Sequence, residues 1–131
     1  MKRIITKLQE EKGQSMVEFA LVAILLLLLV FGIMEFGRAW FRADLLKNAA
    51  NIGARTCAVT KDNAKALAAA QAAIPNYNVA ITTIEVPDCN PLPSVSQVTV
   101  TVTEQFQTVV PSLLKISNSI TLRRTATYRL E

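Results

Sequence analysis

An uncharged apolar stretch from Phe19 to Met34 limits most strongly what this chain can fold into. It contains sixteen residues, and the mostly apolar residues 14–18 extend it to about 20. At about 1.5 Å per residue, a helix of about 20 residues crosses the roughly 30 Å hydrocarbon layer of a bilayer, and it satisfies every backbone polar group internally. We therefore expect a transmembrane helix over residues 14–36.

The flanks of this stretch bear on its orientation. Aromatic and basic side chains typical of a membrane interface follow it: Phe36, Arg38, Trp40 and Arg42. Four basic residues precede the stretch and four follow it up to Arg55, so the positive-inside rule alone decides nothing. We place residues 1–13 in the cytoplasm as a leader and residues 37–131 outside, because two cysteines and a Thr-rich C-terminal half suit an exported domain.

A cleaved secretory signal peptide is the competing interpretation of the same stretch. Gly37-Arg38-Ala39 supplies small residues at the two key positions of a cleavage site after Ala39. Glu35 and Arg38 place charges beside that bond, and the n-region would have to contain three acidic residues before the apolar stretch. These charges favour the uncleaved membrane helix.

Composition argues against several functional classes. The net charge is +4 and the pI about 9.3, but no run of five basic residues occurs, so we expect no nucleic-acid partner. The chain has no histidine, which removes Ser-His-Asp triads, imidazole bases and nearly every zinc site. Its carboxylates have no metal-like spacing, and it has no Gly-rich phosphate loop. We expect neither an enzyme nor a cofactor, metal or small-molecule substrate.

Cys57 and Cys89 are the only two cysteines, and they have no CxxC spacing. In an oxidising compartment they predict one disulfide, which would pin a proline-rich loop at residues 87–93 to the preceding helix. Two reduced thiols in the core are the alternative.

A glutamate inside the apolar stretch is the most informative single residue. Gly13 directly precedes the apolar helix, and Glu18 follows that glycine by five positions. An acidic residue at the centre of a span costs about 2.5–3.5 kcal/mol, so a partner is expected. Proteolysis after Gly13 would supply one, because the new α-amino group on Gln14 lies one helical turn from Glu18, on the same face or offered to a neighbouring chain.

The segment GQSMVEFALVAILLLLLVFGIMEFGRAWF, from Gly13 to Phe41, resembles the TadE-like pseudopilins of the tight-adherence (Flp, type IVc) pilus system. The resemblance implies cleavage between Gly13 and Gln14 by a prepilin peptidase and a role as a minor pilin or pseudopilin in pilus assembly. It also implies a single-pass protein of the bacterial inner membrane, with incorporation into an extracellular pilus as an open option. The implied partners are the membrane, the peptidase and other pilins or assembly proteins contacted through the N-terminal helix.

Both glutamates of this segment have simpler interpretations. Glu18 would be an interfacial carboxylate that reaches the headgroups, with Gly13 as a helix boundary. Glu35 is a second candidate for charge pairing during assembly, but Arg38 lies three residues away on the same helix face and offers it a local partner.

The helical pattern continues beyond the membrane, so one helix of about 45 residues is expected from Gln14 to Cys57. Small residues recur along it with spacings mostly of three and four, which favours close packing between helices. This seam consists of Gly32, Ala39, Ala43, Leu46, Ala50, Gly53 and Cys57. Beyond Ala43, an equally good interpretation is that the seam seats the helix on the sheet of its own chain.

The remaining residues predict a small α+β domain. Asp62 would cap a second helix over residues 63–74, and strands are expected at 79–86, with an irregularity at Thr82-Thr83, and at 97–106 and 120–130. In the second strand Val98, Val100 and Val102 share the inward face, and in the third the inward face has Ile120, Leu122, Ala126, Tyr128 and Leu130. Residues 107–119 would form a long loop with one helical turn at 112–116. We expect a three-stranded antiparallel meander packed on both helices.

Two functional hypotheses remain at this stage. The first is a structural role in tight-adherence pilus assembly. The second is a membrane-anchored or secreted binding or adhesion module unrelated to pili. Arg123, Arg124 and Arg129 on the last strand would meet an acidic partner in a binding module, but such arginines are also common on a plain soluble surface.

Overall fold

The computed structural model describes residues 2–90, 97–109 and 118–129, with side chains from residue 13 onward. Two helices precede three strands: α1 (Lys2–Thr60), α2 (Asn63–Ala72), β1 (Thr82–Glu85), β2 (Gln97–Gln107) and β3 (Ser119–Arg129). The predicted α+β class, with a long N-terminal helix, a short second helix and a three-stranded antiparallel sheet, is confirmed.

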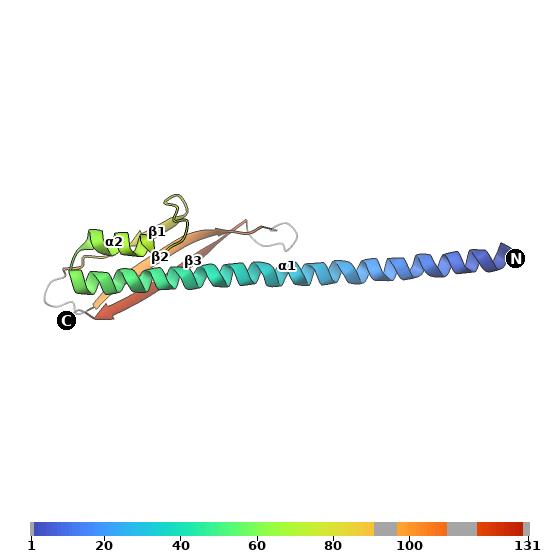
Figure 1. Ribbon diagram of the computed structural model, residues 1–131, viewed down its shortest axis with the longest axis horizontal. Helices are drawn as coiled ribbons and strands as arrows, with labels where there is room; N and C mark the ends of the chain where they lie inside the picture. Colours follow the sequence, from blue (N-terminus) through green and yellow to red (C-terminus); the bar gives the residue numbers. More distant parts are fainter. Residues whose placement is uncertain (1, 91–96, 110–117, 130–131) are drawn as a thin grey trace.

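Helix α1 dominates the molecule. Its 59 residues make it about 90 Å long, and its N-terminal half projects beyond the domain while the sheet and α2 lie along the other half (Figure 1). The helix begins at Lys2 rather than Gln14, so Gly13 lies inside it and is no helix boundary. Lysine, leucine, glutamine and glutamate before Gly13 are good helix formers, and one interior glycine costs only about 1 kcal/mol.

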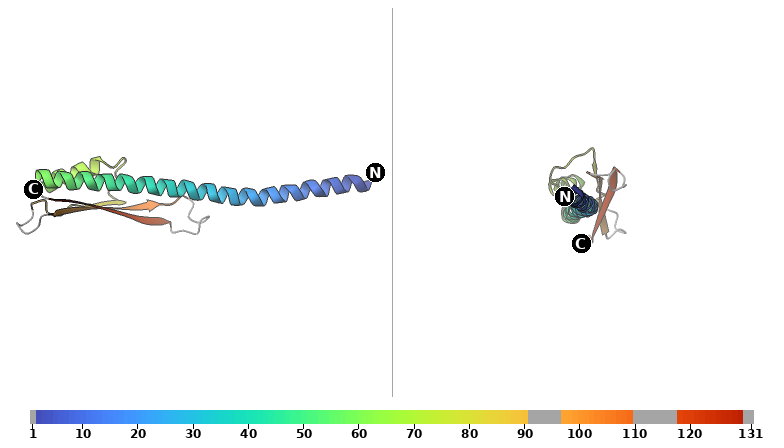
Figure 2. Two further views of the ribbon diagram at one scale, coloured as in Figure 1. Left: turned by 90° about the horizontal axis from the view of Figure 1, so that it is seen from below. Right: turned by 90° about the vertical axis from the view of Figure 1, so that its right-hand side faces the viewer.

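The sheet is a meander of order β1-β2-β3, with both pairs antiparallel. Helices α1 and α2 lie on the same face of this sheet (Figure 2). The inward residues of β2 behave as predicted, since Val98, Val100 and Val102 are buried. Val100 pairs with Ala126 of β3, so the register places a fully buried residue of β2 beside the buried alanine of β3.

Strand β1 is shorter than predicted. The expected irregularity at Thr82-Thr83 is absent, because the strand starts at Thr82. Before it the backbone turns back on itself, with the N–H groups of Ile81 and Thr82 both donating to the carbonyl of Asn78. Val79 is consequently exposed instead of contributing to the core.

Strand β3 is less buried than its alternating pattern predicts. Of the expected inward residues, Ala126 is buried and Leu122 half-buried, whereas Ile120 and Tyr128 are 38% and 39% exposed. The reason is geometric: α1 packs against both β2 and β3, but β3 is an edge strand with a neighbouring strand on one side only. Leu130 and the expected helical turn at 112–116 lie outside the described residues.

Small side chains let α1 approach the sheet and α2 closely. Leu46, Ala49, Ala50 and Ala54 are fully buried. Gly53 is the tightest point, because a Cβ there would lie 3.0 Å from the Cβ of Ala70 and 3.4 Å from Val100 Cγ1. Beyond Ala43, the predicted seam therefore seats the helix on the domain of its own chain.

Helix α2 starts where predicted. Asp62 is its N-cap and accepts hydrogen bonds from the backbone N–H groups of Ala64 and Lys65. The bond from Lys65 is the main cause of a lowered pKa for Asp62. The helix ends at Ala72, two residues before the predicted Ile74, and Ile74 is buried in the core.

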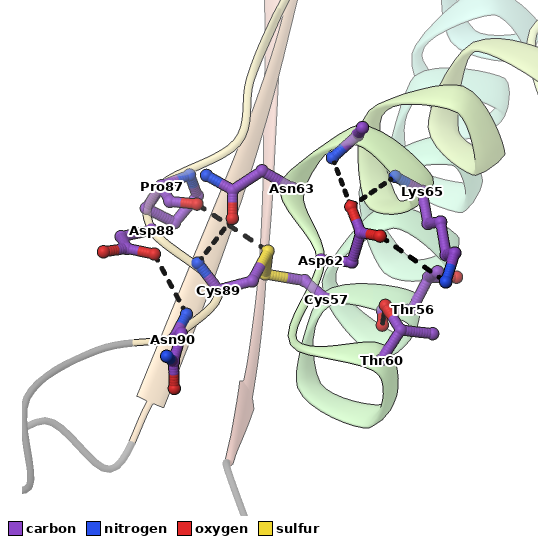
Figure 3. The surroundings of a disulfide bond; sticks show 11 residues. Thr56, Cys57, Thr60, Asp62, Asn63, Lys65, Pro87, Asp88, Cys89 and Asn90 are labelled. Atoms are coloured by element: carbon purple, nitrogen blue, oxygen red, sulfur yellow. Dashed lines mark hydrogen bonds and ion pairs between the residues drawn. A yellow bond between two sulfur atoms is a disulfide. The ribbon is translucent and has the colours of Figure 1, made fainter.

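The disulfide joins Cys57, in the last turn of α1, to Cys89, in the loop after β1 (Figure 3). Both cysteines are fully buried. The Cys89 N–H also donates to Asn63 Oδ1 at 2.9 Å, so the loop is held by α1 and by the first residue of α2. Both helices are thereby tied to the sheet at the same end of the molecule.

Replacing Gly53 tests the close packing of α1. We expect Gly53→Leu to lower the free energy of unfolding by about 1–3 kcal/mol, because the added side chain meets Ala70 and Val100. Gly37→Leu is the matched control, since no atom lies within 4 Å of a Cβ at that position. Calorimetry of the full chain in detergent measures both changes, and equal behaviour of the two variants would contradict this packing.

Removing the disulfide tests how much the domain depends on it. Closing a loop over a sequence separation of 32 contributes about 3–4 kcal/mol in the chain-entropy treatment. We therefore expect the double variant Cys57→Ala and Cys89→Ala to unfold at a much lower temperature than the oxidised protein. An unchanged unfolding temperature would mean that the loop after β1 is held by other contacts.

Candidate functional site: the free helix and its junction with the domain

The part of α1 at residues 14–34 is mostly apolar and is left largely uncovered by the described part of the chain. Its exposed large apolar side chains, from Met16 to Met34, are each 45–75% exposed. Among the described residues, α1 is the one helix that is long and apolar enough to cross a membrane. No residue of its most apolar 18-residue segment is buried. A soluble core helix would instead be covered by its own domain, so this surface requires lipid or other proteins around it.

The predicted processing and pairing residues lie together on this free helix. Gln14 Nε2 donates to Glu18 Oε1 at 3.2 Å, one helical turn away. Both residues are exposed, and Gly13 has no atom within 4 Å of a Cβ position. The side-chain partner of Glu18 is thus a neutral amide, and no ion pair to its carboxylate is found among the side chains described from residue 13 onward.

Glu35 occupies the junction where the free helix meets the domain. It is only 7% exposed. One carboxylate oxygen accepts from Arg38 Nη1 at 2.9 Å, and the other accepts from the backbone N–H of Val109 at 2.9 Å. The local pairing with Arg38 is therefore present, and a bond across 74 positions to the end of β2 accompanies it. Glu35 thus holds the C-terminal end of β2, the end of the sheet closest to the exposed part of α1, against the helix.

Aromatic side chains surround this junction. The rings of Phe36 and Trp40 lie 6.0 Å apart, and both side chains are exposed, as is Phe41. The Arg38 guanidinium lies 5.2 Å from the centre of the Phe106 ring, within range of a cation–π contact. Three exposed aromatics directly after the apolar half of α1 are typical of a membrane–water interface.

Arg42 is placed differently from the interfacial position expected for it. Its guanidinium forms a two-point ion pair with Glu104 of β2, with distances of 2.7 Å and 3.0 Å. It also donates to the carbonyl of Pro75, and Thr82 Oγ1 donates to Glu104 Oε2 at 2.9 Å. Arg42 thus joins α1 to β1, β2 and the segment after α2.

The sequence pattern does not predict the pairing of Arg42 with Glu104, because the two residues are 62 positions apart. One signal could have indicated it. Glu104 continues the inward phase of Val98, Val100 and Val102, and a carboxylate at an inward position requires a cation from the facing element. Arg42, on the facing helix, is that cation.

Gly32 lies before the junction at Glu35, and Ala39 lies between Glu35 and the first buried alanine of the seam, Ala43. Gly32 and Ala39 are both half-buried, and a Cβ at Gly32 would contact nothing within 4 Å. These two positions leave room for another helix, whereas Ala43, Ala50 and Gly53 are already buried. Among the described residues, no group of three or more acids or cysteines could hold a metal ion.

These features define a class: a long-helix protein with one candidate membrane span and an α+β domain on the far half of the helix. Residues 13–55 match the family model described as TadE-like protein. Over that segment the chain is similar to TadE-like proteins, which confirms the resemblance drawn from the sequence. The match includes Gly13, Gln14, Glu18 and Glu35 and ends before Cys57. Neither the curated proteins nor the solved structures contain a significant match to the chain.

Substitution of Arg42 tests the ion pair. We expect Arg42→Met to lower the free energy of unfolding by about 3–5 kcal/mol, because Glu104 would remain buried without its cation. Arg38→Met, at a side chain 44% exposed, should cost under about 1 kcal/mol. Adding Glu104→Leu to Arg42→Met should recover part of the loss. Calorimetry of the three variants measures this, and no recovery in the double variant would contradict the pairing.

Proposed function

We propose that this chain is a minor pilin or pseudopilin that takes part in assembly of a tight-adherence pilus, after a prepilin peptidase cuts it between Gly13 and Gln14. The observation that carries the proposal is the TadE-like helix itself, whose apolar half is exposed and bears Glu18 one turn from Gln14. The proposal assigns no catalytic step and no cofactor to the chain.

The charge on Glu18 gives cleavage before Gln14 a physical purpose, because the cut supplies a cation beside this carboxylate. In the uncut chain its side-chain partner is the Gln14 amide, and an uncompensated carboxylate at depth in a bilayer costs about 2.5–3.5 kcal/mol at the helix centre. Cleavage before Gln14 creates an α-amino group within one turn of Glu18, and the two opposite charges compensate each other. The same pair can form between neighbouring chains, which would set the register of one helix against the next.

The junction of helix and domain supports the same proposal. Glu35 and Arg42 fasten α1 to two points of the domain, Val109 just after β2 and Glu104 within β2, which favours one direction for the free helix. Gly32 lies on this free part and Ala39 just after Glu35, and small side chains at these positions permit close approach of another helix. A rigid domain with a projecting apolar helix is suited to insertion into a bundle of similar helices.

The proposed topology follows from the disulfide and the leader. We place the N-terminus in the cytoplasm, the apolar part of α1 in the inner membrane and the domain outside it. The buried Cys57–Cys89 bond supports this placement, because structural disulfides occur mainly in oxidising compartments and are rare in the cytoplasm. The short basic leader is suited to the cytoplasmic side.

Processing is tested by the N-terminus of the chain in its own cells. We expect a mature protein that begins at Gln14 and lacks thirteen residues of the precursor. Gly13→Val should block this cut, whereas Gly37→Val should leave it unchanged. Mass spectrometry of the membrane-extracted protein measures both. A mature chain that begins at Met1 or at Trp40 would contradict the proposal, since the latter start indicates signal-peptide cleavage.

The role of Glu18 is tested by pilus formation. We expect Glu18→Ala to leave cleavage intact but to reduce the number of surface pili by about tenfold or more, because the new amino group loses its counter-charge. Leu25→Ala, on the same exposed helix, should have little effect. Pili counted by electron microscopy give the comparison, and normal piliation in the Glu18 variant would favour an anchored adhesion module instead.

A further inference from the structure

The far end of the domain carries a basic hollow between α1 and β3. It has a volume of about 570 Å³ and is lined by Arg55, Ala58, Val59, Lys61, Tyr128 and Arg129. Three of these six residues are cations and none is an acid. Within the described part of the chain, none of the three cations takes part in an ion pair.

The hollow is a consequence of how the elements are arranged. Strand β3 is an edge strand, and its C-terminal end is only partly covered by α1, with Tyr128 39% exposed. At Lys61 the backbone adopts a positive φ of 54°, and the chain turns from α1 into α2. Helix α2 packs on the side of α1 away from β3, so it does not cover the hollow (Figure 2). Val59 remains 75% exposed as a result.

The opposite edge of the sheet is acidic. Glu85 at the end of β1 and Asp88 in the following loop are both exposed. Asp88 points away from the disulfide and accepts only a local hydrogen bond, from the Asn90 N–H at 3.0 Å (Figure 3). Asp62 lies nearby, although Lys65 at 3.5 Å partly compensates its charge. Because β1 and β3 are the two outer strands, the acidic and basic surfaces do not overlap.

The two surfaces also lie at the same height along α1. Asp88 adjoins Cys89, which is bonded to Cys57 of α1. Arg55 lies two residues before Cys57, and Lys61 four residues after it. Two copies anchored side by side in one membrane, with the same orientation, would therefore present the acidic edge of one copy directly opposite the basic hollow of the next.

We propose that the basic hollow of one chain binds the acidic β1 edge of a second copy. The contact joins different surfaces of the two partners, so each copy keeps one free surface and further copies can add in a row or helix. Opposite charges favour this arrangement and disfavour the symmetric contact of two like edges. The proposal goes beyond the proposed function and needs only copies anchored in one membrane with one orientation, so its failure would leave the processing at Gly13 untouched.

Cross-linking tests the contact directly. Full-length chains labelled with ¹⁴N or ¹⁵N are mixed, reconstituted into lipid vesicles and treated with a zero-length carbodiimide, which joins amines to carboxylates in contact. We expect mixed-isotope peptides that link Lys61 to Glu85 or Asp88. Their yield should fall several-fold between about 0.05 M and 0.5 M salt, because the screening length shortens. Links found only within single chains would overturn the proposal.

Charge reversal gives the second test. We expect the pair Arg55→Glu and Arg129→Glu to reduce the interchain links about fivefold or more, and the pair Glu85→Lys and Asp88→Lys to do the same. All four changes together should restore association, with links that now join positions 55 or 129 to positions 85 or 88. Arg123→Glu is the matched control, because Arg123 lies on the same strand outside the hollow.

The outcomes separate the possible occupants. If the fourfold variant is folded, with its disulfide formed, and still fails to associate, the second copy is not the occupant. If carbodiimide treatment of native membranes links Lys61 only to a different protein, the proposal is likewise overturned. Restoration of interchain links by the fourfold variant supports it, since neither an anionic polysaccharide nor an unrelated partner would follow a charge swap made within this chain.

Discussion

The ion pair between Arg42 and Glu104 is the interaction on which the arrangement of the domain depends. Glu104 has a side chain only 4% exposed, and a buried carboxylate is tolerated only where a cation and further hydrogen bonds surround it. Arg42, Thr82 and the carbonyl of Pro75 complete that environment. Because these groups come from α1, β1, β2 and the segment after α2, the network is satisfied in one relative placement of those elements.

Helix α1 has two halves in different surroundings. Its C-terminal half is covered by the sheet and α2, which small residues such as Ala50 and Gly53 allow to approach closely. Its residues 14–34 are mostly exposed and strongly apolar. The change occurs at Glu35, where the carboxylate binds both Arg38 and the Val109 N–H. One continuous helix therefore transmits the orientation of the domain to the part suited to a membrane or a bundle.

The charged groups of the molecule are used in two ways. Glu35, Arg42 and Glu104 are partnered inside the chain and serve its own architecture. Glu18, the cations Arg55, Lys61 and Arg129, and the acids Glu85 and Asp88 form no ion pair within the described residues. Charges of this second kind remain available for contacts with other molecules.

Local sequence determined a large part of this protein. Side-chain periodicity and chemistry over a few neighbouring residues account for the apolar run of α1, the cap at Asp62 and the alternating valines of β2. With only two cysteines in the chain, a disulfide within it has one possible pairing. Tertiary structure decided which face of α1 is buried, the shortening of β1, the partial exposure of β3 and the partners of Glu35 and Arg42. Apart from Arg38, which is local to Glu35, those partners lie 74 and 62 positions away, and periodicity holds no information on which distant groups meet once the helix packs on the sheet.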